Sequence, residues 1–548
     1  MGSVPLYNTD FLVLFVRFSK KRSIFADGIS NNLKKNLIMF ENQPKGLYAL
    51  ALANTGERFG YYTMLAVFAL FLRANYGLDA GWAGEIYSDF LMLVYFLPIV
   101  GGWLADRFGF GRMVTIGILI MFGGYLLLSV PLGGDTLALV VMLAALVLIG
   151  LGTGLFKGNL QVMVGDLYND PKYAAQRDSG FSIFYMAINI GALFAPTAAV
   201  KIMEWAQQNL GTSVNDSYHF AFAVACASLI LSIAIYYVFR GTFRHVEGGK
   251  KSADSAAAAV EELPKEETKA RIVALCLVFA VVIFFWMAFH QNGLSLTYFA
   301  DEFTAKTSEG IESMAFNVWN LVAIIFIVYA GFSLFQSKTG KGKVISAVVI
   351  AIALAFLFLQ YDATTGQVVA VSAPIFQQFN PFYVVALTPV SLAIFGALSK
   401  KGKEPSAPRK IAYGMVVAGL AYCVMAVASF GLPMPQTTVG ADGEPVAVHV
   451  ADVTPQLLIY TYLILTFAEL LLSPMGISFV SKVAPPKYKG LMMGGWFVAT
   501  AIGNKLVGVG GYLWGSIPLW AVWSVFIALC IISAVFMFSI MKRLEKVC

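Results

Sequence analysis

The chain has 548 residues, of which 58% are hydrophobic and only 13% are charged, and its mean hydropathy is +0.73. A soluble protein carries about 25% charged residues, so the composition excludes an ordinary soluble domain. The net charge of +7 does not indicate nucleic-acid binding, because the basic residues lie in loops between apolar runs. These runs are about 20 residues long, the length that crosses a bilayer as a helix. We therefore expect an all-α, polytopic membrane protein.

The apolar runs form two groups on either side of a charged linker. Residues 1–44 are a leader, of which residues 1–38 are a disordered segment or a start placed too early, since Met39 leads directly into the first span. The first bundle, residues 45–240, has predicted spans near 46–72, 83–104, 112–131, 137–164, 179–200 and 217–240. After the linker at 241–270, residues 271–541 have predicted spans near 271–299, 314–336, 344–361, 381–399, 410–430, 456–481, 489–513 and 518–541, followed by a tail at 542–548. These are about fourteen helices.

The loop charges predict the orientation of the spans. With the amino terminus inside, the outer loops hold only Arg73, Lys201 and Lys306, whereas the inner loops hold "LADRFGFGR", "SKTGKGK" and "SKKGKEPSAPRK". Because Lys and Arg accumulate in cytoplasmic loops, we expect both termini in the cytoplasm. The short outer loops favour the plasma membrane of a bacterium.

Two helical bundles joined by a cytoplasmic linker are typical of secondary transporters. The sequence has no G-x-x-x-x-G-K-[ST] segment, which argues against a nucleotide-driven pump. It also lacks H-E-x-x-H and G-x-S-x-G, so an enzyme is not expected. Four of the five cysteines lie inside apolar runs and no metal-ligand spacing occurs, so neither a disulfide framework nor a metal site is expected.

The first span carries Glu57 and Arg58 side by side, although charged residues inside a bilayer are costly and usually functional. One face of this helix presents Asn54, Arg58, Tyr61 and Leu65, with Glu57 and Tyr62 at its edges. Such a face should point into a cavity or at other polar groups. A buried ion pair that only locks helices together is one interpretation, and a site for an anion or a zwitterion is the other.

Lys157 and Glu469 are two further charged residues inside spans. Lys157 lies in the glycine-rich "GLGTGLFKGNLQ" and needs an anionic partner, for which Glu57 is the expected choice; alternatively it extends towards the inner surface. Glu469 is the single carboxylate of "YLILTFAELLLSPMG" in the second bundle, and its alternative role is an interhelical hydrogen bond. A solute with a carboxylate and an ammonium could bridge Arg58 and Lys157 to Glu469, which would draw the bundles together.

Three softer candidates are Asn189, Asn380 and Trp496. Amides and indoles inside spans often serve helix packing instead.

Several motifs together resemble one family. "GERFGYY" resembles the ExxERFxYY signature of the proton-dependent oligopeptide transporter family, a branch of the major facilitator superfamily, and "FYMAINIGALFAP" resembles its FYxxINxG signature. "GGWLADRFGFGR", with Gly101, Asp106 and Arg107, resembles the loop motif of the superfamily. "GTGLFKGN", "FNPFYVV", "LTFAELLLSPMG" and "LMMGGWFVATAIGN" resemble the fourth, eighth, tenth and eleventh spans of the family. The resemblance covers residues 45–541 apart from an insertion.

The resemblance implies the major facilitator fold, with two six-helix bundles and here an extra two-helix hairpin at about 314–361. It implies import of di- and tripeptides with protons, a monomer, and no cofactor other than the coupling ion. Arg58 and Lys157 would hold the peptide carboxylate, and Glu469 with Asn189 and Asn380 would hold its amino terminus. The implied pocket also includes Tyr61, Tyr62, Ser473 and Trp496. Glu57 would exchange partners with Lys157 as protons and substrate bind, so the implied coupling residues are Glu57, Lys157 and Glu469.

Four positions depart from the family pattern. Asn54 replaces the first Glu of the signature, and an amide cannot carry a proton. Leu65 replaces a common basic residue, Gly158 replaces a usual Pro, and His290 replaces a usual Glu in the seventh span. Coupling is therefore altered or lost, or His290 supplies a titrating group, because imidazole changes charge near neutral pH; a neutral, hydrogen-bonding His290 is the alternative.

Three other functions remain open at this point. The same fold could carry another small anion or an amino-acid-like solute, although Glu469 argues for an amine on the substrate. It could be a peptide facilitator that does not use protons. A non-transporting receptor is a third possibility, which the loss of a carboxylate at Asn54 permits and the buried charges in both bundles oppose.

Overall fold

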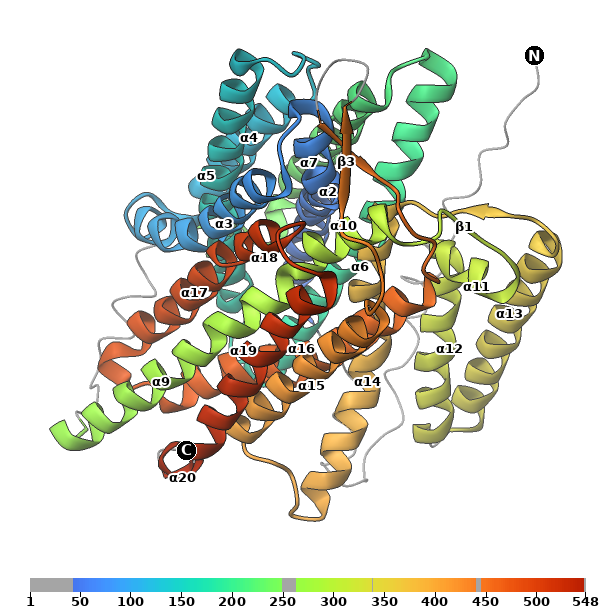
Figure 1. Ribbon diagram of the computed structural model, residues 1–548. Coiled ribbons are helices and arrows are strands. Elements are labelled where there is room, and N and C mark those ends of the chain that lie inside the picture. Colours follow the sequence, from blue (N-terminus) through green and yellow to red (C-terminus); the bar gives the residue numbers. More distant parts are fainter. Residues whose placement is uncertain (1–42, 249–262, 338, 440–444, 547–548) are drawn as a thin grey trace.

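The structure is a computed structural model that describes residues 43–248, 263–337, 339–439 and 445–546. Most of the predicted leader and the middle of the predicted linker lie outside these ranges. The first bundle consists of α2 (Lys45–Tyr76), α3 (Ala80–Phe108), α4 (Phe110–Leu128), α5 (Thr136–Asp166), α6 (Arg177–Leu210) and α7 (Val214–Val238). The second consists of α9 (Lys265–Phe289), α10 (Ser295–Glu302), α14 (Phe379–Lys400), α15 (Ala407–Ala428), α16 (Gln456–Val483), α17 (Lys489–Lys505), α18 (Gly508–Leu513) and α19 (Leu519–Ser539). The two bundles lie side by side (Figure 1).

The predicted spans and the observed helices agree closely at most ends. Twelve helical segments in the described ranges are long and apolar enough to cross a membrane. The expected total of about fourteen also counted α2, which contains the Glu57–Arg58 pair, and α17, which has only 17 residues; neither is among the twelve. Asp79 and Asp135 begin α3 and α5 by accepting hydrogen bonds from backbone N–H groups of the first turn. Gly77 ends α2 with a φ of 58°, a conformation that glycine adopts without strain.

Two spans that the sequence presents as single helices are broken. The predicted span 271–299 is α9, a 3-10 turn at His290–Gly293, and α10, while the predicted span 489–513 is α17 and α18. The breaks contact each other, because the Gln291 side chain donates to the carbonyl oxygen of Val507 at 3.0 Å. A Cβ atom on Gly293 would lie 2.0 Å from the hydroxyl oxygen of Tyr87. Irregular backbone at membrane depth needs such polar partners and close packing.

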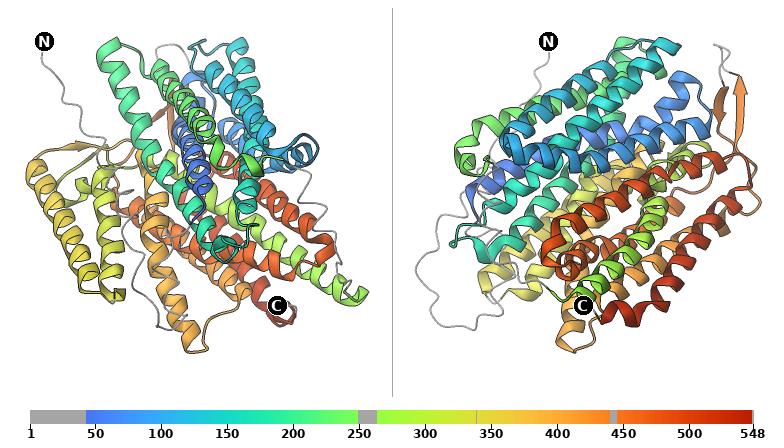
Figure 2. Two further views of the ribbon diagram at one scale, coloured as in Figure 1. Left: turned by 180° about the vertical axis from the view of Figure 1, so that it is seen from behind. Right: turned by 90° about the vertical axis from the view of Figure 1, so that its left-hand side faces the viewer.

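The extra hairpin consists of α12 (Val318–Gln336) and α13 (Gly340–Thr364), close to the predicted 314–336 and 344–361. It lies at the edge of the molecule beside α14 in opposite views (Figure 1, Figure 2). Its two ends are joined by the short antiparallel strands β1 (Thr307–Ser308) and β2 (Val369–Ala370). The sequence also did not predict a second ladder between α15 and α16, formed by β3 (Gln436–Val439) and β4 (Pro445–Val448).

Ion pairs join the two bundles at the end where α2 meets α3. Arg73 on α2 pairs with Glu302 on α10, and the indole N–H of Trp514 donates to the same carboxylate at 3.1 Å. Lys505 on α17 pairs with Glu85 on α3 and lies 2.6 Å from Asp89 on that helix. We refer to these contacts as the outer closure, a name that follows the orientation expected from the loop charges.

Candidate functional site between the bundles

The Glu57–Arg58 pair lies in the interior of the first bundle, as the helical pattern predicts. The two residues are 1% and 3% exposed, and Arg58 donates from Nε and Nη2 to the two carboxylate oxygens of Glu57. The guanidinium also lies 4.5 Å from the ring centre of Tyr61, in a cation–π contact. Each charge is therefore compensated, which burial of an ion pair requires.

Lys157 does not pair with Glu57 in this structure. Its Nζ atom lies 3.9 Å from the ring centre of Tyr95 on α3. The expected Glu57–Lys157 pair is absent here, and both oxygens of that carboxylate accept from Arg58 instead. An ammonium that rests on an aromatic ring retains donors for a negatively charged ligand.

Glu469 and Asn380 lie together in the second bundle, as expected. The Asn380 amide donates to Glu469 Oε2 at 2.9 Å and to Thr466 Oγ1 at 3.1 Å. Glu469 is 9% exposed, and Oε1 accepts no hydrogen bond from the residues that the structure describes. Asn380 thus fixes one carboxylate oxygen, and the other can accept a proton or a hydrogen bond from a ligand ammonium.

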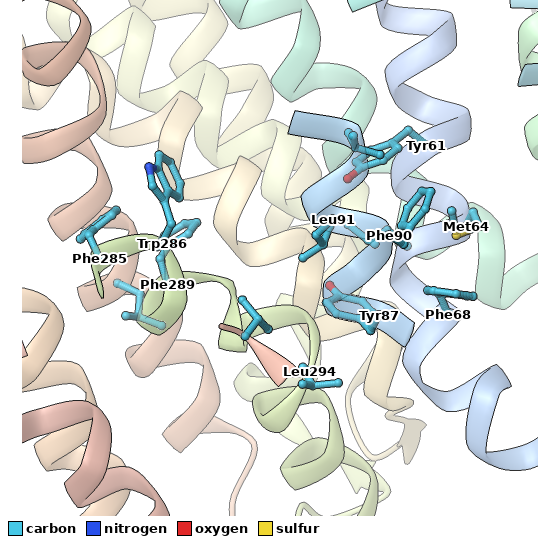
Figure 3. Close-up of a cluster of buried hydrophobic side chains, with 14 of the residues drawn as sticks. Tyr61, Met64, Phe68, Tyr87, Phe90, Leu91, Phe285, Trp286, Phe289 and Leu294 are labelled. Atoms are coloured by element: carbon cyan, nitrogen blue, oxygen red, sulfur yellow. The ribbon is translucent and has the colours of Figure 1, made fainter. Parts of the chain in front are cut away.

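Tyrosine hydroxyls lie between the charges of the two bundles. Arg58 and Glu469 both act electrostatically on the hydroxyls of Tyr62 and Tyr95. Glu469 also acts on Tyr185 of α6. These tyrosines are therefore within electrostatic range of charges from both bundles. Figure 3 shows Tyr61 of α2 beside Phe90 of α3.

His290 lies at the break between α9 and α10. Its Nδ1 atom is 2.5 Å from Oδ1 of Asn504, and its ring stacks on Trp286 with centres 5.0 Å apart. Because an amide oxygen only accepts, Nδ1 carries the hydrogen in this arrangement. In the neutral ring, Nε2 can then accept a hydrogen bond or a proton. The ring centre of Tyr95 is 6.2 Å from that of His290. Tyr95 therefore lies between Lys157 of the first bundle and His290 of the second.

The remaining expected residues have more structural surroundings. Trp496 is 3% exposed and covers Gly476, where a Cβ atom would lie 1.8 Å from the indole. The Asn189 amide donates to the backbone oxygen of Tyr185 at 3.0 Å, within its own helix. Ser473 is half-buried on α16. For Asn189 and Trp496 the packing interpretation therefore stays open.

The loop motif lies away from the charged site, at the other end of α3. A Cβ atom on Gly101 would lie 2.1 Å from the carbonyl oxygen of Gly154 on α5, so the two helices cross at backbone contact. Asp106 and Arg107 are exposed, and the Arg107 guanidinium lies 4.1 Å from the ring centre of Trp103. This motif packs helices and presents charge, but it does not contribute to the site.

Sequence reasoning missed Tyr95, Tyr185 and Asn504. Tyr185 stands inside the quoted "FYMAINIGALFAP", and Asn504 ends "LMMGGWFVATAIGN", so both motifs contained a usable signal. Tyr95 stands in an apolar run with no polar neighbour within three residues. Only its position across from Lys157 and His290 reveals it.

The broken helices, the two bundles and the buried charges between them define a membrane transporter of the major facilitator type. The sequence profile described as the POT family matches residues 111–261 and 352–513, more than half of the chain. The chain belongs to the POT family of transporters, as the motifs predicted. It is not an enzyme but a member of a transporter family.

Similar proteins agree with this family. The chain is 30% identical over 502 residues to the uncharacterised transporter YclF of Bacillus subtilis, covering 87% of this chain and 90% of that protein. It is 28% identical to a di-/tripeptide transporter of Lactococcus lactis, with coverage of 87% and 90%. It is 26% identical to dipeptide and tripeptide permease A of Escherichia coli, with coverage of 86% and 84%.

Solved structures confirm the fold. A crystal structure of a POT peptide transporter in complex with sulfate has a TM-score of 0.68 and 23% identity, covering 94% of this chain and 99% of that one. A POT family transporter in complex with 5-aminolevulinic acid also has a TM-score of 0.68, with 21% identity and coverage of 93% and 98%.

Proposed function

We propose that the chain imports di- and tripeptides by alternating access, with the peptide held between the two bundles. The observation that carries this proposal is the distribution of charge: Arg58 and Lys157 belong to one bundle and Glu469 to the other, and all three lie within electrostatic range of shared tyrosines. A peptide has a carboxylate and an ammonium at its ends, which match these charges. Relatives named as di- and tripeptide transporters support the same class of substrate.

The outer closure supports alternating access. Its ion pairs join α2 and α3 to α10 and α17, so they must break before a solute can enter from outside. A peptide that attracts both bundles would favour their approach around it. We also propose that both termini are cytoplasmic, that the membrane is a bacterial plasma membrane, and that the transporter acts as a monomer; one solved structure of the same fold is described as tetrameric.

Blocked dipeptides test the two-ended site. We expect N-acetylation or C-amidation of dialanine each to weaken binding to the purified protein by about a hundredfold, because each removes one buried charge contact worth roughly 2–3 kcal/mol. The measurement is competition against a labelled dipeptide in detergent. If the N-acetylated peptide competes as well as the free one while the C-amide does not, the site recognises an anion and Glu469 has another role.

Proton coupling belongs to this proposal, with Glu57, Glu469 and His290 as the titratable groups at the site. Asn54 is 3% exposed and lies on the same helix as Glu57, but its amide cannot take up a proton. His290 is placed to link the bundles, because Tyr95 lies between it and Lys157. A proton taken up at His290 would therefore repel the ammonium group of Lys157 at the cationic end of the site.

We expect the His290→Gln variant to lose most of the pH dependence of dipeptide uptake between about pH 4 and 8, because an amide cannot exchange a proton as an imidazole does. Gln keeps a donor for Asn504 and so preserves the contact between the broken helices. The measurement is initial uptake across that pH range. A variant with the parental pH profile would assign coupling to the carboxylates and leave His290 as a neutral donor to Asn504.

An amino-acid-like solute is a second candidate. A solved POT transporter of the same fold was crystallised with 5-aminolevulinic acid, and such a solute also has an ammonium and a carboxylate. Competition by 5-aminolevulinic acid against dialanine distinguishes a peptide-selective site from one that reads only the two end charges.

A further inference from the structure

We propose that the inserted hairpin α12–α13 stabilises the outer closure by holding η8 (Ala373–Gln378), a short helix that bonds to both bundles. This inference rests on the alternating-access mechanism above. It assigns a role to the one insertion that separates β1 from β2. Phe316, Gln377 and Gln378 are then positioning residues for the transport cycle.

The two glutamines of η8 contact opposite bundles at once. Gln377 donates to the backbone oxygen of Ala66 on α2 at 3.1 Å and to the Thr297 hydroxyl on α10 at 3.2 Å. Gln378 is fully buried and accepts from the Thr197 hydroxyl on α6 at 2.9 Å. Opening the outer end separates α2 and α6 from α10, so these bonds must break in that step.

The base of the hairpin packs directly on η8. The Phe316 ring, in η7 (Met314–Phe316) just before α12, lies 5.6 Å from the ring of Phe376 and 6.1 Å from that of Phe379, and all three are almost fully buried. Gln378 also donates to the backbone oxygen of Ala315 at 3.4 Å. The position of η8 therefore depends on the residues that begin the insertion.

The hairpin itself spans the seam between the bundles. The Tyr329 hydroxyl on α12 donates to the backbone oxygen of Val385 on α14 at 3.2 Å. At the outer end of α12, the Trp319 ring lies 5.4 Å from that of Phe194 on α6. Only 11% of the apolar stretch of α13 that could cross the membrane is buried inside the protein. The contacts to the bundles therefore come from α12. The left view of Figure 2 shows the pair at one side of the molecule, beside α14.

The bonds from Gln377 and Gln378 to α2 and α6 cross between the bundles, so they require the closed outer end. The packing of η8 on the base of the hairpin lies on one side of the seam and persists in both states. A contact present in one state shifts the equilibrium by its own free energy. The hairpin therefore favours the outward-closed conformation, and weakening its hold on η8 should populate the outward-open one. This role is independent of which solute is carried.

The test measures the distance between spin labels at Leu132 and Ser516, exposed residues on the outer turns of the two bundles, after replacement of the five native cysteines. Without substrate, we expect Phe316→Ala to raise the outward-open to outward-closed ratio about tenfold, because η8 loses the packing that holds its two glutamines against α2 and α6. Phe335→Ala is the matched control, since Phe335 lies on α12 but is 88% exposed.

A second variant removes residues 309–368 and joins Ser308 to Val369 through an Asn-Gly turn, because these residues are paired in the β1–β2 ladder. It should show the same shift towards the open state. An unchanged distance distribution in Phe316→Ala would overturn the proposal, whether or not the deletion variant folds. Because no peptide is added, a failure of peptide transport leaves this result readable, and the two proposals can fail separately.

Discussion

Peptide uptake is expected to fall about a hundredfold when Glu469 is replaced by Gln. The substitution keeps the shape of the side chain and an oxygen that accepts from Asn380, but it removes the charge that pairs with the peptide ammonium. A charged hydrogen bond of this kind contributes about 1.5–3 kcal/mol, and 2.7 kcal/mol corresponds to a factor of one hundred. The measurement is initial uptake of a labelled dipeptide into proteoliposomes.

The matched control is Glu309→Gln, which makes the same charge change at an exposed position. We expect it to transport as the parental protein does. If Glu469→Gln retains peptide uptake, the amino terminus is recognised elsewhere. If it loses peptide uptake but carries a small anion, the substrate class must be widened.

The largest stability effect is expected for Arg58→Gln. This change leaves the Glu57 carboxylate buried at 1% exposure without its partner, and breaking a buried ion pair from one side costs about 3–5 kcal/mol. The double variant with Glu57→Gln removes both charges and should recover most of the lost thermal stability in detergent. We expect it to remain unable to bind dipeptides, because the carboxylate end of the site has lost its guanidinium.

This comparison separates the two interpretations of the pair. A lock between helices predicts that the stable double variant transports peptides normally. A substrate site predicts stability without binding. Normal transport by the double variant would show that the pair stabilises the fold and does not bind substrate.

The sequence was most informative where charged residues occur inside predicted membrane spans. Buried charges such as Glu57, Arg58 and Glu469 are rare in spans, so their presence located the site and their motifs located the family. The hydrophobic pattern also predicted the lengths of the spans, and it showed which charged residues lie in the loops between them. The resemblance assigned Asn380 and Glu469 to the same end of the site, and the two side chains are hydrogen-bonded.

Features that depend on packing between distant segments could not be predicted. Lys157 rests on Tyr95 while Arg58 pairs with Glu57, an arrangement that the separate motifs do not encode. The contact made by the break at His290–Gly293 also depends on packing, because Gln291 donates to Val507 between α17 and α18. Asn504 became part of the site through packing of the same kind. The break itself falls on the polar segment HQNG, a local signal that the prediction of a single span did not use.

Uptake of a labelled dipeptide into proteoliposomes, with and without an inside-alkaline pH gradient, tests the central claim most directly. We predict uptake above protein-free liposomes and accumulation beyond equilibrium when the gradient is present. Equilibration that ignores the gradient would retain peptide transport and remove proton coupling. No uptake above protein-free liposomes under either condition would contradict the assignment of this chain as a peptide transporter.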